Sequence, residues 1–169
     1  MEESDNLELS ASRWLAFSPA RVWAACTRRE FLERWWSPED LRTTVRRLDV
    51  RPGGQVEFRI RYVPALLGKD SAQAFRAARI PISFELRGTL TEVLTERLLT
   101  FDLTLDIGKA GAGVKTITRL ELNPEGEGTQ VRLTAVGKGT PHWRTLGQQN
   151  LEAQLERLES VLLSEPVSR

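Results

Sequence analysis

Hydrophobic and polar residues alternate with a period of two through most of the middle of the chain. Val56, Phe58, Ile60 and Tyr62 alternate with charged residues, and the run 99–107 repeats the pattern. Residues i and i+2 of a strand face the same side of a sheet, so these runs predict strands with one buried face. Weaker alternation and turn-rich connections such as 123–129 predict further strands in antiparallel hairpins, at 7–17, before Pro52-Gly53-Gly54, and at 84–90, 114–122 and 130–136.

The period changes to 3.6 after Gly139, which predicts one long helix at the end of the chain. Thr140 is placed to cap this helix and Pro141 to open it, with Leu151, Leu155, Leu158 and Leu162 on one face. Two short helices are predicted after the first strand. Ser18 and Pro19 open one of them, and Thr27 and Glu30 have capping-box spacing for a second helix over Glu30–Trp36.

This order of elements predicts an α+β fold. An antiparallel sheet of about six or seven strands would curve and bury its apolar face under the C-terminal helix. We expect a single domain over residues 1–169, because no repeat or linker interrupts the pattern.

The composition of the chain predicts where the protein is located, but it says little about its function. The chain has 24 Lys plus Arg against 23 Asp plus Glu, so its net charge draws it neither to nucleic acid nor to an anionic membrane. Its single cysteine, the lack of a leader pattern and the lack of a long apolar run predict a cytoplasmic protein that does not insert into a membrane.

Several motifs together resemble one known family. They are LAFSPARVWAACT at 15–27, RWWSP at 34–38, DVRPGG at 49–54, the Gly-Thr pair at 128–129 and the terminal helix. Their order is similar to that of the SRPBCC superfamily, and within it to the branch named for the C-terminal domain of the activator of the heat-shock-protein ATPase. The resemblance implies a helix-grip fold, with a cavity between sheet and helix that often holds a lipid, hormone or polyketide.

We therefore expect a module that binds a small hydrophobic molecule in this cavity. Sheet residues at the inward positions of the predicted strands would form its wall, and the first turns of the last helix would face them. The candidates are Phe58, Tyr62, Phe84, Leu86, Phe101, Leu103, Thr118, Leu120 and Leu133 from the sheet, and His142, Trp143, Leu146 and Asn150 from the helix.

The adjacent Trp35 and Trp36, at the end of the second short helix, are expected to have different roles. One ring would anchor the helix pair to the core, while Trp36 would border the cavity mouth; the alternative is that both are ordinary core residues. The resemblance implies a shorter hairpin at about residues 64–81, so this segment is an insertion relative to the family. Within it, Ser71 could cap a helix from Ala72 to Arg79 that carries Phe75 as a lid. The insertion is equally compatible with a simple surface excursion.

The sequence gives little support for phosphate, metal or nucleic-acid binding. The run GKAGAGVKT at 108–116 resembles a phosphate-binding loop, but Val114 occupies the lysine position and a strand pattern follows it. With one histidine and one cysteine we expect no metal site and no cofactor; Cys26 is interpreted as a small buried hydrophobe.

Six arginines lie between Arg42 and Arg61, and we expect them on a solvated sheet face rather than in a nucleic-acid site.

Two alternative functions remain open. A cyclase or aldolase-like enzyme could act in the same cavity through Tyr62, His142 or Arg13, although no paired carboxylates or acid–base dyad are apparent, so no catalytic residue is assigned. The family resemblance alone also implies a co-chaperone that acts through its outer surface. A homodimer is left open.

Overall fold

In the described part of the chain, the fold is one curved antiparallel sheet with three helices on its inner face. The computed structural model describes residues 5–37, 41–63, 83–106, 114–139 and 141–165. The helices are α1 (Pro19–Thr27), α2 (Arg29–Trp35) and α4 (Pro141–Ser164). The strands are β1 (Asp5–Leu15), β2 (Leu41–Leu48), β3 (Gln55–Tyr62), β4 (Ser83–Leu94), β5 (Leu98–Asp106), β6 (Val114–Glu125) and β7 (Gly128–Gly139).

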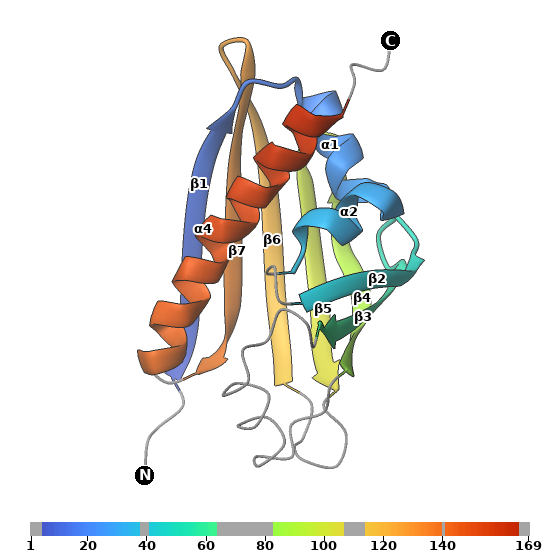
Figure 1. Cartoon of the computed structure of the whole chain (residues 1–169), viewed down its shortest axis with the longest axis vertical. Helices are drawn as coiled ribbons and strands as arrows, with labels where there is room; N and C mark the ends of the chain where they lie inside the picture. Colours follow the sequence, from blue (N-terminus) through green and yellow to red (C-terminus); the bar gives the residue numbers. More distant parts are fainter. Residues whose placement is uncertain (1–4, 38–40, 64–82, 107–113, 140, 166–169) are drawn as a thin grey trace.

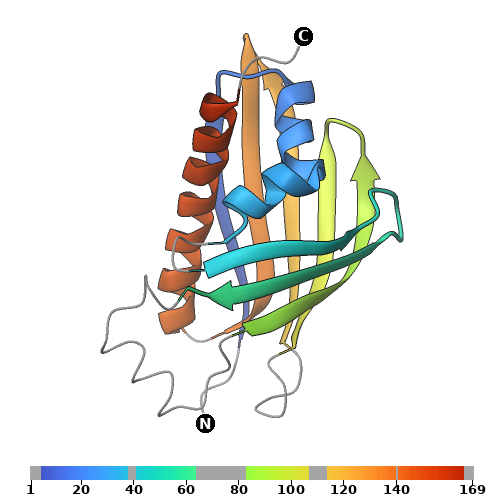
Figure 2. The ribbon, with the colours of Figure 1, turned by 45° about the vertical axis from the view of Figure 1, so that its right-hand side comes forward.

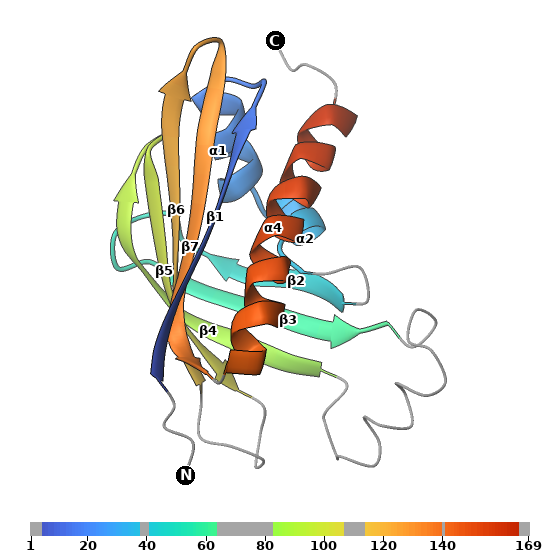
Figure 3. The same cartoon turned by 90° about the vertical axis from the view of Figure 1, so that its left-hand side faces the viewer.

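The sheet has the order β1-β7-β6-β5-β4-β3-β2, so the first two strands of the chain form its two edges. The chain crosses from β1 to β2 through α1 and α2, and then runs back strand by strand until β7 pairs with β1 (Figure 1). Figure 2 shows β2, β3 and β4 turning across the end of the sheet below α2. Figure 3 shows α4 along one face of this curved sheet. The predicted α+β architecture is confirmed.

The long helix α4 buries its leucine face, as its periodicity predicts. Leu151, Leu155, Leu158 and Leu162 are at most 4% exposed, and Val161 is buried beside them. They join a core that includes Leu15 of β1, Phe58 of β3 and Leu133 of β7. None of the described helices combines the length and apolar character needed to cross a membrane.

The two short helices begin differently from one another. Ser18 caps α1 as predicted, because its hydroxyl accepts a hydrogen bond from the Arg21 N–H. The predicted capping box at Thr27 and Glu30 is wrong. The Thr27 hydroxyl donates backwards to the Trp23 carbonyl, and α2 begins at Arg29 after an Arg28 N-cap that makes no side-chain bond. Only one residue separates α1 from α2, which leaves Thr27 inside the end of α1.

Two glycines mark places where the backbone has special requirements. Gly53 has φ of +79° in the predicted turn between β2 and β3, a conformation that residues with a side chain rarely adopt. Gly88 lies on β4, where an added Cβ would collide with the backbone carbonyl of Asp102 on β5. Glycine therefore allows β4 and β5 to approach closely at the bend of the sheet.

Candidate functional site

The inner face of the sheet divides into a buried part and a half-buried part. Beneath the helices, Phe58, Leu90, Phe101, Leu120 and Leu133 are at most 1% exposed. Farther along the same face, residues of the same strand parity retain partial contact with solvent. We call these half-buried residues the inner band: Leu9, Tyr62, Phe84, Leu86, Leu105, Thr116, Thr118 and Ala135.

Strand register makes the inner band continuous across the sheet. Leu9 pairs with Ala135, which pairs with Thr118, so β1, β7 and β6 contribute neighbouring side chains. Leu86 and Leu105 pair across β4 and β5. At the far end, the rings of Tyr62 and Phe84 meet edge to face with centroids 6.3 Å apart. Six neighbouring strands, β1, β7, β6, β5, β4 and β3, thus contribute to one surface on the inside of the sheet.

The chemistry of the inner band is mostly apolar. It contains leucine, alanine and phenylalanine side chains, with the hydroxyls of Thr116, Thr118 and Tyr62 as its polar groups and no charged residue. Ligand sites for small hydrophobic molecules typically have this composition, in which a few polar groups orient an apolar body.

Trp35 and Trp36 have different surroundings at the inner border of this surface. The Trp35 indole is 1% exposed and donates to the Ala25 carbonyl at 2.8 Å, which ties α2 to α1. Trp36 is 8% exposed, and its ring packs against Phe58 and Phe101 with centroids 5.0 and 5.1 Å away. The structure therefore anchors Trp35 in the helix pair and lays Trp36 on the sheet. A ligand contact by Trp36 stays a prediction.

Side chains of α4 hold this end of α2 in place. Gln154 donates to the Trp36 carbonyl at 2.7 Å, and the Arg157 Nε donates to the Trp35 carbonyl at 3.2 Å. The last carbonyls of a helix have no partner within the helix, so bonds from another element satisfy them. Gln154 is itself only 5% exposed, which makes this a buried and directional link between α2 and α4.

The predicted helix side of the cavity is only partly described. Gly147 lies so close to β1 that an added Cβ would be 2.5 Å from Leu9 Cδ1. Asn150 is exposed, so it does not lie among the buried residues that face the sheet. The side chains of His142, Trp143 and Leu146, and the proposed lid residue Phe75, lie outside the described residues.

Sequence reasoning placed Phe58, Phe101, Leu103, Leu120 and Leu133 on the inner face, and the structure does the same. All five are fully buried, however, so they support the inner band from beneath the helices. The prediction omitted four members of the band: Leu9, Leu105, Thr116 and Ala135. Strand parity could have identified these four residues, because each has the same parity as a predicted wall residue on its own strand or on the paired strand.

The residues considered for catalysis do not come together in the described structure. Arg13 lies on the inner face of β1, but its guanidinium forms an ion pair with Glu159 at 3.0 Å, which raises its pKa. Tyr62 lies at the opposite end of the sheet, beside Phe84. Cys26 is fully buried, and burial raises the pKa of its thiol, which disfavours a nucleophilic thiolate.

Metal and phosphate chemistry gain no support from the described part of the chain. Within it, no three His, Cys, Asp or Glu side chains are grouped to hold a metal ion. The strand predicted after the glycine-rich run is confirmed as β6, which begins at Val114. A phosphate-binding loop would instead lead into a helix. The absence of a metal or cofactor stays a prediction.

A sheet closed on one side by a long C-terminal helix, with two short helices after the first strand, defines the helix-grip class of fold. Residues 16–163 match the family model described as activator of Hsp90 ATPase homolog 1-like protein. The chain belongs to this family, which is part of the SRPBCC superfamily and has a fold consistent with hydrophobic-ligand binding.

Solved structures with the same fold have low sequence identity to the chain. Protein CV1439 from Chromobacterium violaceum aligns with a TM-score of 0.73 and 18% identity, over 94% of this chain and 98% of that one. Mll3558 from Rhizobium loti gives a TM-score of 0.70 and 19% identity, over 95% and 99%. NE0264 from Nitrosomonas europaea gives 0.64 and 24%, over 93% and 94%. No match is found among curated proteins.

Proposed function

We propose that the inner band binds a small, mostly hydrophobic ligand, lipid- or polyketide-like, between the sheet and α4. The proposal rests mainly on one observation. The inner band continues the apolar surface of the core, but it is only half-buried, whereas the core residues are fully buried beneath the helices. Apolar surface left in contact with water carries a free-energy cost, and a ligand that covers it recovers part of that free energy.

The few polar groups of the inner band suggest how such a ligand would be oriented. The Thr116 and Thr118 hydroxyls lie two residues apart on β6, and the Tyr62 phenol lies on β3. A ligand with an apolar body and one or two oxygens could hydrogen-bond in the middle of the band, on β6, or at its β3 end. Enzymatic turnover and co-chaperone action stay alternatives, and no contact among the described residues favours either of them.

An uncharged fluorescent dye tests the proposal without involving the charged outer face. N-phenyl-1-naphthylamine should bind the folded protein saturably with about one-to-one stoichiometry. Leu86→Asn places an amide in the apolar band and should weaken binding about tenfold, which corresponds to about 1.4 kcal/mol. Thr118→Phe should also weaken binding, because the larger ring fills the surface that the dye would cover.

Ile117→Asn is the matched control. Ile117 is 38% exposed and neighbours Thr118 on β6, but it lies on the opposite face of the sheet. This variant should bind the dye as the wild type does. Equal losses for Leu86→Asn and Ile117→Asn, with both variants folded, would place the dye elsewhere and refute the proposal.

A further inference from the structure

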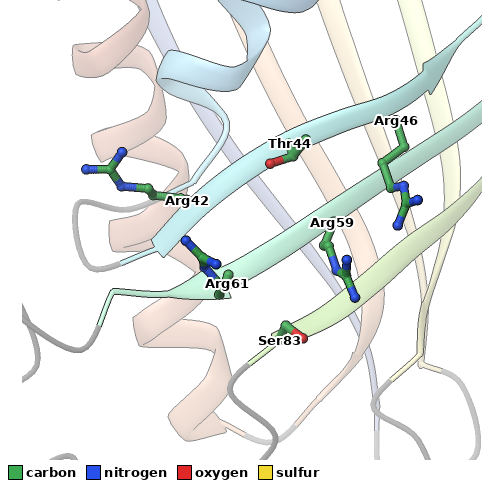
Figure 4. Close-up of a pocket in the computed structure, with 6 residues that line it drawn as sticks. All are labelled: Arg42, Thr44, Arg46, Arg59, Arg61 and Ser83. Atoms are coloured by element: carbon green, nitrogen blue, oxygen red, sulfur yellow. The ribbon is translucent and has the colours of Figure 1, made fainter.

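The outer face of the sheet carries a cluster of arginines around a hollow of about 770 Å³. We call it the arginine patch: Arg42, Thr44 and Arg46 of β2, Arg59 and Arg61 of β3, and Ser83 of β4. The six residues come from three adjacent strands on the side away from α4 (Figure 4). The sequence analysis expected these arginines on an outer, solvated face, and that placement is confirmed.

The register places like charges directly opposite one another. Arg42 pairs with Arg61 across β2 and β3, and Arg61 pairs with Ser83 across β3 and β4. Like charges at directly opposed positions destabilise a sheet. Such a local conflict with stability is typical of functional sites.

A β-bulge places a further exposed arginine, Arg47, beside the patch. The register of β2 against β3 shifts between Val45 and Arg47, which makes Arg46 the extra residue. Without the shift, the alternation of β2 would continue from the buried Val45 through an outward Arg46 to an inward Arg47. With it, both arginines are exposed, and Arg46 lines the hollow.

Carboxylates of the protein neutralise only part of this charge. Arg46 lies 3.8 Å from Glu85, whose carboxylate also pairs with Arg87, while Glu57 pairs with Arg87 at 3.7 Å. Among the described residues, no ion pair is found for Arg42, Arg59 or Arg61. Glu85 also lies directly opposite Arg59 in the register of β3 and β4, so the positive charge is concentrated at the end of the three strands that carries Arg42 and Arg61.

The neighbouring sheet edge is closed to an added strand near the bulge. The Val45 N–H donates to Glu33 Oε1 at 2.8 Å, and the Arg46 carbonyl accepts from the Arg29 guanidinium at 3.5 Å. Backbone groups that an extended peptide would need on β2 are thus occupied by α2. A partner of the patch is better placed over its face than along its edge.

We infer that the arginine patch binds a compact anion that carries two or more phosphate groups. Guanidinium groups match phosphate oxygens in a planar, two-pronged geometry, and the Thr44 and Ser83 hydroxyls can donate to the same ligand. None of the described residues that line the hollow is aromatic, so this part of its wall offers no platform on which a nucleobase could stack. The site lies on the opposite face from the inner band and is independent of the function proposed for that band.

Calorimetric titration with inorganic tripolyphosphate tests this inference. The wild type should bind it with one-to-one stoichiometry and at least tenfold more tightly than inorganic phosphate, and added salt should weaken the binding. The double variant Arg59→Gln/Arg61→Gln should lose at least tenfold in affinity. Its melting temperature should be unchanged or higher, because the change relieves the repulsion between Arg42 and Arg61.

Arg119→Gln/Arg132→Gln is the matched control, since it also removes two outer-face arginines but from β6 and β7, outside the hollow. It should bind tripolyphosphate within twofold of the wild type. Equal weakening in both double variants would show that net charge alone attracts the anion, and would overturn the inference. No binding by the wild type would do the same. Tighter binding of a DNA duplex or a polyglutamate peptide through Arg59 and Arg61 would also overturn it, in favour of a macromolecular partner.

Discussion

At the scale of single residues, the adjacent tryptophans show how one helix end serves two surroundings. Consecutive residues at the end of a helix point about 100° apart, so Trp35 turns into α1 while Trp36 turns onto Phe58 and Phe101. The sequence suggested this division, with Trp36 on the cavity side, and left open that both rings are core residues; both are buried in the core. The sequence could not predict the bond from the Trp35 indole to the Ala25 carbonyl, because only the folded helix pair brings the two groups within reach.

Cys26 predicts a specific dependence of stability on pH. Burial raises the pKa of its thiol above the ordinary value of 9.0, so the unfolded chain loses this proton first as pH rises. The resulting stability is fully present below pH 9.0 and is lost above it. The free energy of unfolding should fall more steeply in the wild type than in Cys26→Ala, by about 1.4 kcal/mol per pH unit. Denaturant titrations across this range would refute the assignment if the two curves stayed parallel.

At the scale of elements, period and parity predicted most of what the structure shows. Alternation located the strands and assigned Phe58, Phe101 and Leu133 to the inner face, and the leucine repeat assigned the buried face of α4. Parity could not separate the buried part of that face from the inner band, because the difference depends on which residues the helices cover. The capping-box prediction at Thr27 failed because α2 follows α1 too closely to begin with a free cap.

The buried face of α4 can be tested with two leucines from the same helix. Leu155 is 1% exposed and Leu163 is 71% exposed. Leu155→Ala should lower the free energy of unfolding by about 2 to 5 kcal/mol through lost burial and a residual cavity. Leu163→Ala should change it by no more than about 0.5 kcal/mol. Denaturant unfolding that gave similar losses for both would mean that this face of the helix is not core.

At the scale of the whole molecule, the sheet separates two surfaces of opposite chemistry. Its inner face joins the core to the apolar inner band, while the outer face of β2 to β4 carries the arginine patch. The near-neutral net charge of the chain does not indicate the arginine patch, because the 23 acidic residues balance the basic residues over the whole chain but not within the patch. Cytoplasmic location stays a prediction from the sequence, and a homodimer stays open.

The central claim, that the inner band binds an apolar ligand, is tested most directly by NMR of the methyl groups on β6 and β7. Thr118 and Ala135 face inwards, whereas their chain neighbours Ile117 and Val136 face outwards. Saturation with N-phenyl-1-naphthylamine should shift the Thr118 and Ala135 methyl signals and leave those of Ile117 and Val136 in place. Shifts confined to the outer pair, or spread equally over both pairs, would contradict the account.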